Sequence, residues 1–241
     1  MIMNEKLTSR IEKARLERSF TQGQVAQAIG VSRPTYVNIE AGKKELTVRQ
    51  AEALSSMLRI SMEDILGAAD GAAVFADVLS ATEKYKQVIL NALKYGADDD
   101  GKITKTKLAK LVYLADFTWY YLHSAPMSGM TYRKLPRGPV ADVYFRALDE
   151  MEEDGTIIRE PKGKAILFYL VEKDAPNSKL TDDEQVLIKK ISEAWRGKPT
   201  NDIVNFTHEQ LPWQVCRDGE AIPYGLIAQE EPERVYGTIQ L

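Results

Sequence analysis

Residue types that proteins use for redox and metal chemistry are scarce in this sequence. Its 241 residues include one cysteine, Cys216, so the chain cannot form an internal disulfide. The two histidines, His123 and His208, lie far apart, and with a single thiol they make no zinc-binding set. We therefore expect no metal and no cofactor.

Long apolar runs are missing as well. No stretch approaches the roughly 18 consecutive apolar residues of a membrane-spanning helix, and the first residues, MIMNEKLTSRIEK, lack the apolar core of a signal peptide. We therefore expect a cytoplasmic protein without a membrane partner. The hydrophobic content of 44% and the charged content of 28% are those of an ordinary globular protein. At roughly 150 residues per domain, the length predicts two domains.

The net charge of −3 is unevenly distributed along the chain. Residues 1–66 carry ten lysines and arginines and eight acidic residues, a balance of +2. Residues 67–241 carry the other 22 basic and 27 acidic residues, a balance of −5. Attraction to nucleic-acid phosphates is therefore expected only in the N-terminal part.

Helix signals follow one another closely in the N-terminal part. Thr21 followed by Gln24 is a capping-box pattern, which satisfies free backbone N–H groups at the start of a helix. Ser32 caps a further helix over residues 32–41, with Pro34 in the first turn, where a missing N–H costs nothing. The spacing predicts two short helices joined by a tight turn.

The helix over residues 32–41 has two distinguishable faces. The three-residue spacing of Tyr36 and Ile39 predicts that both face the core. The opposite face carries Arg33, Thr35, Val37 and Asn38. Because arginine suits guanine, asparagine suits adenine and an exposed valine packs on a thymine methyl group, we expect this face to read bases in a major groove. In the alternative interpretation, Val37 only covers a neighbouring side chain.

The segment TQGQVAQAIGVSRPTYVNIEAGKKELTVRQAEALSSMLRISMEDIL resembles the Cro/C1-type helix-turn-helix (XRE) family almost throughout. The likeness includes the Thr-Gln start of one helix, the Gly-Val-Ser turn and the Ile-Glu-x-Gly-Lys end of the next. It implies a five-helix DNA-binding bundle over residues 1–66, with its last helices at about 48–58 and 61–66. Members of this family bind paired half-sites as dimers, so the resemblance implies a homodimer on operator DNA.

The same resemblance implies roles for single residues. In this family an arginine and a glutamate form a largely buried structural ion pair, and the matching positions are Arg15 and Glu40. Gln22, Lys43 and Lys44 would hold DNA phosphates, and the alternative for the two lysines is a solvated charged turn. The resulting set of DNA-binding residues is Gln22, Ser32, Arg33, Thr35, Val37, Asn38, Lys43 and Lys44.

Residues 67–82, GAADGAAVFADVLSAT, have the composition of a linker that contains one weak helix. The alternative for the larger apolar residues of this segment is a small dimer contact, made by Val74, Phe75, Val78 and Leu79. Residues 83–241 are then expected to form a second domain.

The periodicity of the second domain predicts several helices and one antiparallel hairpin. The expected elements are a core helix from Thr104 to about Leu122, a loop, a helix ending at Asp154, a hairpin with a four-residue tip at 161–164, a helix capped by Thr181 and Glu184, and a final helix over about 201–210. The core helix is expected to bury Leu108, Leu111, Val112, Ala115, Trp119 and Leu122. The whole chain is thus expected to be mainly α, with an α+β second domain that contains a small antiparallel hairpin or sheet.

The segment LAKLVYLADFTWYYLHSAPMSGMTYRKLPRGPVADVYFRALDEM resembles the SocA-like, or Panacea, domain, and the likeness extends over about residues 87–236. It includes the opening of a helix at Gly138, Pro139 and Val140. Proteins similar to this are antitoxins that bind and neutralise a cognate protein toxin, and one family member instead delivers its toxin to a protease as an adaptor. The motif residues are expected to be structural, and the sequence assigns no toxin-binding surface.

Enzymatic alternatives lack their residue patterns. Neither histidine belongs to a His-Glu-x-x-His motif, and no glycine-rich phosphate loop is present. Ser128 and Lys164 suit a self-cleaving serine-lysine protease by residue type only. We therefore predict no catalytic residues and no enzymatic activity.

The sequence leads to the hypothesis of an antitoxin that neutralises a toxin through residues 83–241 and represses its own operon through residues 1–66. One alternative is a regulator whose second domain senses a small ligand or only dimerises. A variant of it is a winged helix with Lys162 and Lys164 at the wing tip. Another alternative is a phage or mobile-element protein that binds a host factor.

Overall fold

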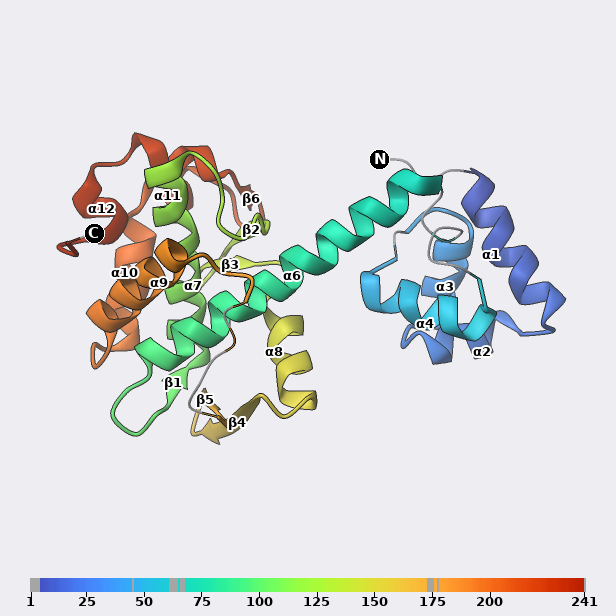
Figure 1. Ribbon diagram of the computed structural model, residues 1–241, viewed down its shortest axis with the longest axis horizontal. Helices are drawn as coiled ribbons and strands as arrows, with labels where there is room; N and C mark the ends of the chain where they lie inside the picture. The colour runs from blue at the N-terminus through green and yellow to red at the C-terminus, as the bar shows by residue number, and fades with distance from the viewer. Residues whose placement is uncertain are drawn as a thin grey trace. The chain divides into compact units, whose positions relative to one another are not determined.

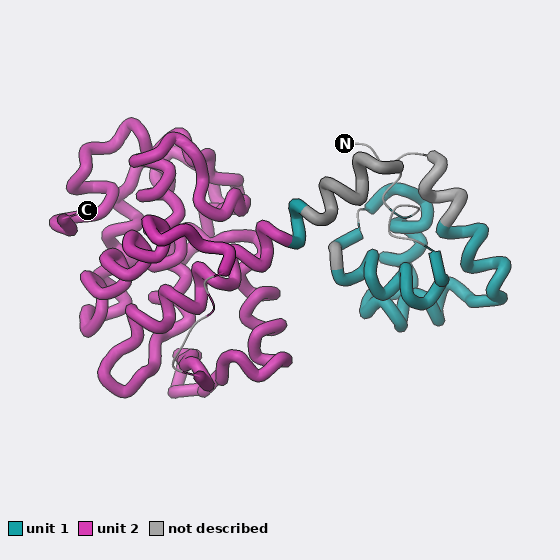
Figure 2. Tube along the Cα trace, in the orientation of Figure 1, with its two compact units in different colours: residues 1–79 teal, residues 80–241 magenta. Residues whose placement is uncertain are grey.

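The computed structural model describes residues 5–44, 46–60, 65, 68–172, 176 and 178–240. The chain forms two compact units, residues 1–79 and 80–241 (Figure 2). Each unit has a hydrophobic core of its own. The expected fold class, mainly α with small antiparallel sheets in the second part, is confirmed.

The helices described in the first unit are α1 (Glu5–Glu17), α2 (Gln22–Ala28), α3 (Arg33–Glu40) and α4 (Val48–Leu58) (Figure 1). Of these, α2 and α3 begin at the caps that the sequence predicts. Thr21 and Gln24 form the capping box of α2, and Ser32 caps α3 by accepting a hydrogen bond from the backbone N–H of Thr35. Each cap of this kind stabilises its helix by about 1 kcal/mol.

The core of the first unit is built from one face of each helix. Tyr36 and Ile39 are 0% and 1% exposed, so α3 buries the predicted face. Val25 of α2 and Leu54 of α4 lie in the same cluster. Of the helix expected over residues 61–66, the structure describes one residue only, and the rest of that prediction lies outside the described residues.

Helix α6 (Ala68–Gly96) corrects the expected linker. It is 29 residues long and includes almost all of residues 67–82, and the boundary between the units, at 79/80, falls inside it. The physical reason is that the segment contains no proline and is rich in alanine, the strongest helix former. Its C-terminal half supplies core residues of the second unit, among them Tyr85, Val88, Ile89 and Leu93.

The second unit contains many short elements besides α6 (Figure 1). In chain order they are β1 (Ile103–Thr104), α7 (Lys105–His123), β2 (Tyr132–Leu135), β3 (Gly138–Ala141), α8 (Tyr144–Glu153), β4 (Ile157–Lys162), β5 (Ala165–Leu170), α9 (Asp182–Trp195), α10 (Thr200–Glu209), α11 (Leu211–Val215), β6 (Ala221–Ile222), the 3₁₀ helix η1 (Tyr224–Gln229) and α12 (Pro232–Tyr236). The sequence predicts a single helix near residues 201–210, and the structure adds α11, η1 and α12 after it.

Helix α7 is the centre of the second unit. It packs against α9, α10, α12, η1 and β3, and all of its residues from 107 to 118 are buried. A helix that is buried on every side must be enclosed by other elements, which is the arrangement here. Two of its expected core residues are only partly buried or exposed: Trp119 packs at the edge of the core, and Leu122 is 45% exposed because it follows the enclosed stretch.

Two antiparallel sheets of three strands flank the helices, with the orders β1-β5-β4 and β3-β2-β6. The β4–β5 hairpin confirms the predicted hairpin, but its tip is shorter than the expected four residues. Lys162 pairs with Ala165, which leaves Gly163 and Lys164 as the turn. Gly163 has a positive φ of +59°, which glycine adopts without strain.

Residues 138–140 do not open a helix, which corrects the sequence-based interpretation. They form β3, and α8 begins at Tyr144. Pro139 is tolerated in β3 because this strand lies at the edge of its sheet. Gly138 has a φ of +97°, and a Cβ there would lie 2.6 Å from Cε of Lys110 on α7, so this position requires glycine.

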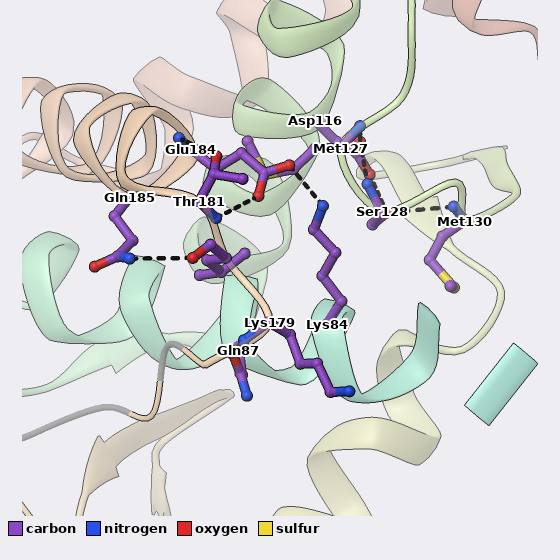
Figure 3. A network of polar contacts seen from close by, with 11 residues as sticks. Lys84, Gln87, Asp116, Met127, Ser128, Met130, Lys179, Thr181, Glu184 and Gln185 are labelled. Atoms are coloured by element: carbon purple, nitrogen blue, oxygen red, sulfur yellow. Dashed lines mark hydrogen bonds and ion pairs between the residues drawn. The ribbon is translucent and has the colours of Figure 1, made fainter. Parts of the chain in front are cut away.

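Asp116 of α7 is the polar centre of the second unit. It is fully buried, and its Oδ1 accepts the backbone N–H groups of Met127 at 3.0 Å and Ser128 at 3.1 Å. Its Oδ2 accepts the hydroxyls of Tyr132 at 3.1 Å, Tyr224 at 2.9 Å and Ser128. Figure 3 shows Asp116 beside Met127 and Ser128. Burial raises the pKa of this carboxyl, and the hydrogen bonds from Ser128, Tyr224 and Tyr132 act in the opposite direction. One carboxylate thus joins α7 to the following loop, to β2 and to η1.

Polar contacts also connect α6 with α9 and the segment before it (Figure 3). Nζ of Lys84 lies 2.6 Å from Oε1 of Glu184, which is 4% exposed. Glu184 completes the predicted capping box with Thr181. Oε1 of Gln87 accepts the backbone N–H of Lys179 at 2.8 Å. The part of α6 inside the second unit is therefore held by polar as well as apolar contacts.

We expect Asp116→Ala to lower the free energy of unfolding of the second unit by more than about 3 kcal/mol, because it leaves buried donors without an acceptor. The matched control is Asp142→Ala, since the Asp142–Arg133 pair is more than 40% exposed on both side chains. The control should cost less than about 1 kcal/mol. Urea unfolding of both variants measures the difference, and equal losses would contradict the role assigned to Asp116.

Candidate nucleic-acid interface and a cavity of the second unit

Helix α3 presents a polar and partly apolar surface to solvent. Arg33 and Asn38 are exposed, and Val37 is 37% exposed. Thr35 is half-buried, and its hydroxyl lies 3.0 Å from Oγ of Ser32. The outward face of α3 thus carries a guanidinium, an amide and a branched apolar group, while the Ser32 hydroxyl is engaged in capping the helix.

Beneath this surface, Glu40 accepts hydrogen bonds from several elements. Its Oε1 accepts from Nε of Arg15 at 2.6 Å and from the hydroxyl of Tyr36 at 3.1 Å. Its Oε2 accepts from Nη2 of Arg15 at 3.3 Å and from Nε2 of Gln22 at 2.7 Å. Arg15 and Glu40 are 8% and 7% exposed, so α1, α2 and α3 are joined by a buried ion pair. Removal of one partner of such a pair costs about 3–5 kcal/mol.

The ionisation of this pair follows from its contacts. Burial alone would raise the pKa of the Glu40 carboxyl, but the hydrogen bonds from Arg15, Gln22 and Tyr36 and the charge of Arg15 outweigh burial and lower it. The hydrogen bond to Glu40 raises the pKa of Arg15. Both groups therefore stay charged at neutral pH.

Gln22 connects the buried pair to the surface of α3. Its Nε2 donates to Glu40, and its Oε1 lies 3.5 Å from Nη2 of Arg33. Sequence reasoning predicted a phosphate contact for Gln22 and missed this bridge. No sequence signal reveals it, because the bridge depends on how α2 and α3 cross.

The turn after α3 carries two exposed lysines. The backbone N–H groups of Lys43 and Lys44 both donate to the carbonyl of Asn38, at 2.7 and 3.1 Å. Gly42 has a φ of +72°, which closes this turn. The backbone of both lysines is thereby held next to the C-terminal end of the helix that carries Arg33 and Asn38.

The residues considered for catalysis in the second unit have structural contacts. The hydroxyl of Ser128 donates to Asp116 and accepts the backbone N–H of Met130 at 3.2 Å. The ring of His208 stacks on Trp213 with 3.9 Å between centroids. In the part of the chain that the structure describes, no group of three or more His, Cys, Asp or Glu residues is placed to hold a metal ion.

A cavity of about 350 Å³ opens on the second unit. It lies between the first half of α7, the β2–β3 turn and the start of α8. Its wall is mostly apolar, with Ala109, Leu135 and Val140 among the lining residues. Sequence reasoning missed it, because three separate segments form it.

Comparisons with known proteins agree with both halves of this description. Residues 11–65 match the family model "Helix-turn-helix", and residues 108–214 match the family model "Antitoxin SocA-like, Panacea domain". The first unit thus contains a segment similar to helix-turn-helix domains, and the second unit contains one similar to SocA-like, Panacea domains. Because of these likenesses, we call the two units the helix-turn-helix domain and the Panacea domain. This confirms the two resemblances seen in the sequence.

One relative among curated proteins is the "Uncharacterized HTH-type transcriptional regulator YqaE" of Bacillus subtilis (strain 168). It is 27% identical over 94 residues, which cover 39% of this chain and 76% of the relative. No solved structure matches the chain significantly. No helix among the described residues is long and apolar enough to cross a membrane. The chain is thus similar to a helix-turn-helix regulator over part of its length and to SocA-like antitoxins over another part.

Lys110 is an unusual buried cation of the Panacea domain. It is 1% exposed, and its Nζ donates to the carbonyl of Pro139 at 2.7 Å. Burial lowers the pKa of this ammonium group to about 7. Burial and the charges of Lys110 and Lys134 also lower the pKa of His208 on α10. The aliphatic stem of Lys110 passes under Gly138. A Cβ at position 138 would lie too close to this stem, so only glycine leaves room for it.

We expect the stability of the Panacea domain to rise between pH 7 and pH 10 through Lys110. The unfolded chain, with a lysine pKa near 10.5, binds this proton over a range in which the folded state has released it. Lys110→Met removes this contribution, so the unfolding free energy of the variant relative to the wild type should fall as the pH rises. Urea unfolding at pH 7 and pH 9.5 measures this, with Lys164→Met as the exposed control. A difference that does not change with pH would contradict the assignment.

Proposed function

We propose that this protein is an antitoxin that binds and neutralises a cognate protein toxin through its Panacea domain and represses its own operon through its helix-turn-helix domain. The observation that carries the proposal is the presence of both domains in one chain. The Panacea domain supplies the protein-binding half by its likeness to SocA-like antitoxins. The helix-turn-helix domain supplies the operator-binding half.

The surface of α3 supports operator recognition. Arg33 and Asn38 are exposed donors and acceptors of the kind that read guanine and adenine, and Val37 offers an apolar group to a thymine methyl. The buried Arg15–Glu40 pair fixes α3 against α1. Gln22 reaches the same network and steadies Arg33 at 3.5 Å. A rigid reading helix lowers the conformational entropy lost on binding DNA.

We further propose that Lys43 and Lys44 hold phosphates and that two copies of the chain bind paired half-sites as a dimer. Both lysines are exposed, beside the C-terminal end of α3. Residues 1–66 have a net charge of +2 and are the part of the chain that attracts DNA. Residues 67–241 have a net charge of −5, which disfavours DNA and suits a protein partner for the Panacea domain.

The central experiment is co-expression of the full chain with the product of the adjacent open reading frame. That product should stop growth when it is expressed alone, and the full chain should restore growth and co-purify with it. Recovery of growth together with loss of the neighbour's product would instead indicate delivery to a protease. An adjacent product that is not toxic, or that the full chain never rescues, would contradict the antitoxin proposal.

We expect Arg33→Ala combined with Asn38→Ala to abolish specific operator binding and to leave neutralisation unchanged. Each base contact of this type contributes about 1–3 kcal/mol of discrimination. The full chain is used because α6 crosses the boundary between the units, so a truncation would cut a helix. Gel-shift titration and the growth assay provide the two readouts. Loss of neutralisation in the folded double variant would contradict separate roles for the two domains.

Lys43→Ala combined with Lys44→Ala should weaken binding to all DNA sequences alike. Each lost phosphate contact reduces the slope of log K against log salt by about 0.9, so the double variant should lose nearly 2. Fluorescence anisotropy with operator and scrambled DNA over a range of salt measures both quantities. A loss confined to the operator would show that the lysines read bases.

A further inference from the structure

The cavity of the Panacea domain has a distinctive charge pattern. Its ionisable lining residues, apart from Tyr144, are cationic: Lys105, Lys110 and Arg137. Among the described residues, no aspartate or glutamate lines it, although residues 67–241 carry five more acidic than basic side chains. A positive potential is thus concentrated at one concave place on an otherwise acidic part of the chain.

Two of these cations are accessible and have no acidic partner. Lys105 is half-buried on α7, and Arg137 is exposed in the two-residue turn between β2 and β3. Within the described residues, neither side chain has a carboxylate within 4 Å, whereas most other buried or half-buried cations of this unit are paired. Nζ of Lys105 lies 5.2 Å from the ring centroid of Phe145. The cations at the cavity are therefore available to a bound anion.

The cavity also exposes apolar surface that a ligand could cover. Phe145 on α8 is 46% exposed and lines the cavity with Ala109, Leu135 and Val140. An exposed aromatic ring next to a concave apolar wall is typical of a binding site. The volume of about 350 Å³ lies in the range of small-molecule pockets, roughly 300–1,000 Å³.

We propose that this cavity binds a small apolar molecule that carries one carboxylate. The apolar body lies against Phe145 and the aliphatic wall, and the carboxylate pairs with Lys105 and with the planar guanidinium of Arg137, which suits bidentate binding. A single carboxylate fits better than a phosphate, because the rim offers two accessible cations and the rest of the wall is mostly apolar. The chain would thus bind a small-molecule ligand, whether or not it neutralises a toxin.

The site is tested on the full-length protein with 8-anilinonaphthalene-1-sulfonate, a fluorescent aromatic anion, as the probe. Its emission should rise saturably with wild-type protein, and 4-phenylbutyrate should displace it. The neutral 4-phenylbutan-1-ol and the cationic 4-phenylbutylamine should displace it at least tenfold less effectively. Equal displacement by the acid and the alcohol would overturn the proposal, because the cations would then play no part.

The variant Lys105→Gln with Arg137→Gln should bind the probe and 4-phenylbutyrate at least tenfold more weakly. Its matched control is Lys162→Gln with Lys164→Gln, the same change of charge at the exposed β4–β5 turn, which should bind within twofold of the wild type. Phe145→Ala should weaken binding as well, and circular dichroism and thermal melting check that all variants are folded.

Two further results would overturn the proposal. One is the absence of saturable binding by the wild type at millimolar 4-phenylbutyrate. The other is unchanged acid binding in the Lys105 and Arg137 double variant. If the double variant loses only the ability to hold a co-expressed toxin, the cavity is a protein-docking surface and the small-acid proposal is wrong.

Discussion

A buried carboxylate is stable only when its oxygens are supplied with donors, and each unit of this protein is organised around one such group. In the first unit, Glu40 receives Arg15, Gln22 and Tyr36. In the second, Asp116 receives two backbone N–H groups and three hydroxyls. Apart from Tyr36, which lies on the same helix as Glu40, the donors come from other segments than the helix that carries the carboxylate. The carboxylates therefore specify which elements pack together. Apolar packing alone is less specific.

The same constraint also shapes the surface of α3 that we propose to read DNA. The Arg15–Glu40 pair is largely shielded from solvent, yet it fixes the orientation of α3 through the end of that helix. Gln22 carries the same network outward to Arg33. A buried ion pair adds little net stability compared with an apolar core of the same shape, so its value here is geometric. The pair keeps Arg33, Val37 and Asn38, the residues that we propose to read bases, in one arrangement.

Sequence reasoning succeeded where the signal was local. The caps at Thr21, Ser32 and Thr181 indicate helix starts, because a side-chain oxygen and the N–H groups it satisfies lie within three residues of one another. The Arg15–Glu40 pair came from a family likeness and not from spacing. Side-chain periodicity alone does not indicate such a pair.

Other features depend on segments that are far apart, and no local pattern reveals them. Residues 138–141 are a strand because β2 lies beside them, and β2 in turn pairs with residues 221–222, about ninety positions later. The cavity combines α7, a turn and α8. The helix expected in the linker is longer than the composition indicates, because a proline-free, alanine-rich segment joined to an apolar helix continues that helix.

The close approach of β3 to α7 has a consequence for how this fold tolerates change. Lys110 passes beneath Gly138, and even one added carbon would lie 2.6 Å from its stem. A shorter residue at 110 would relieve that contact, but the φ of +97° at 138 would still exclude other side chains. The close approach of β3 to α7 therefore depends on the absence of a Cβ at position 138, and glycine is required there whatever residue stands at position 110.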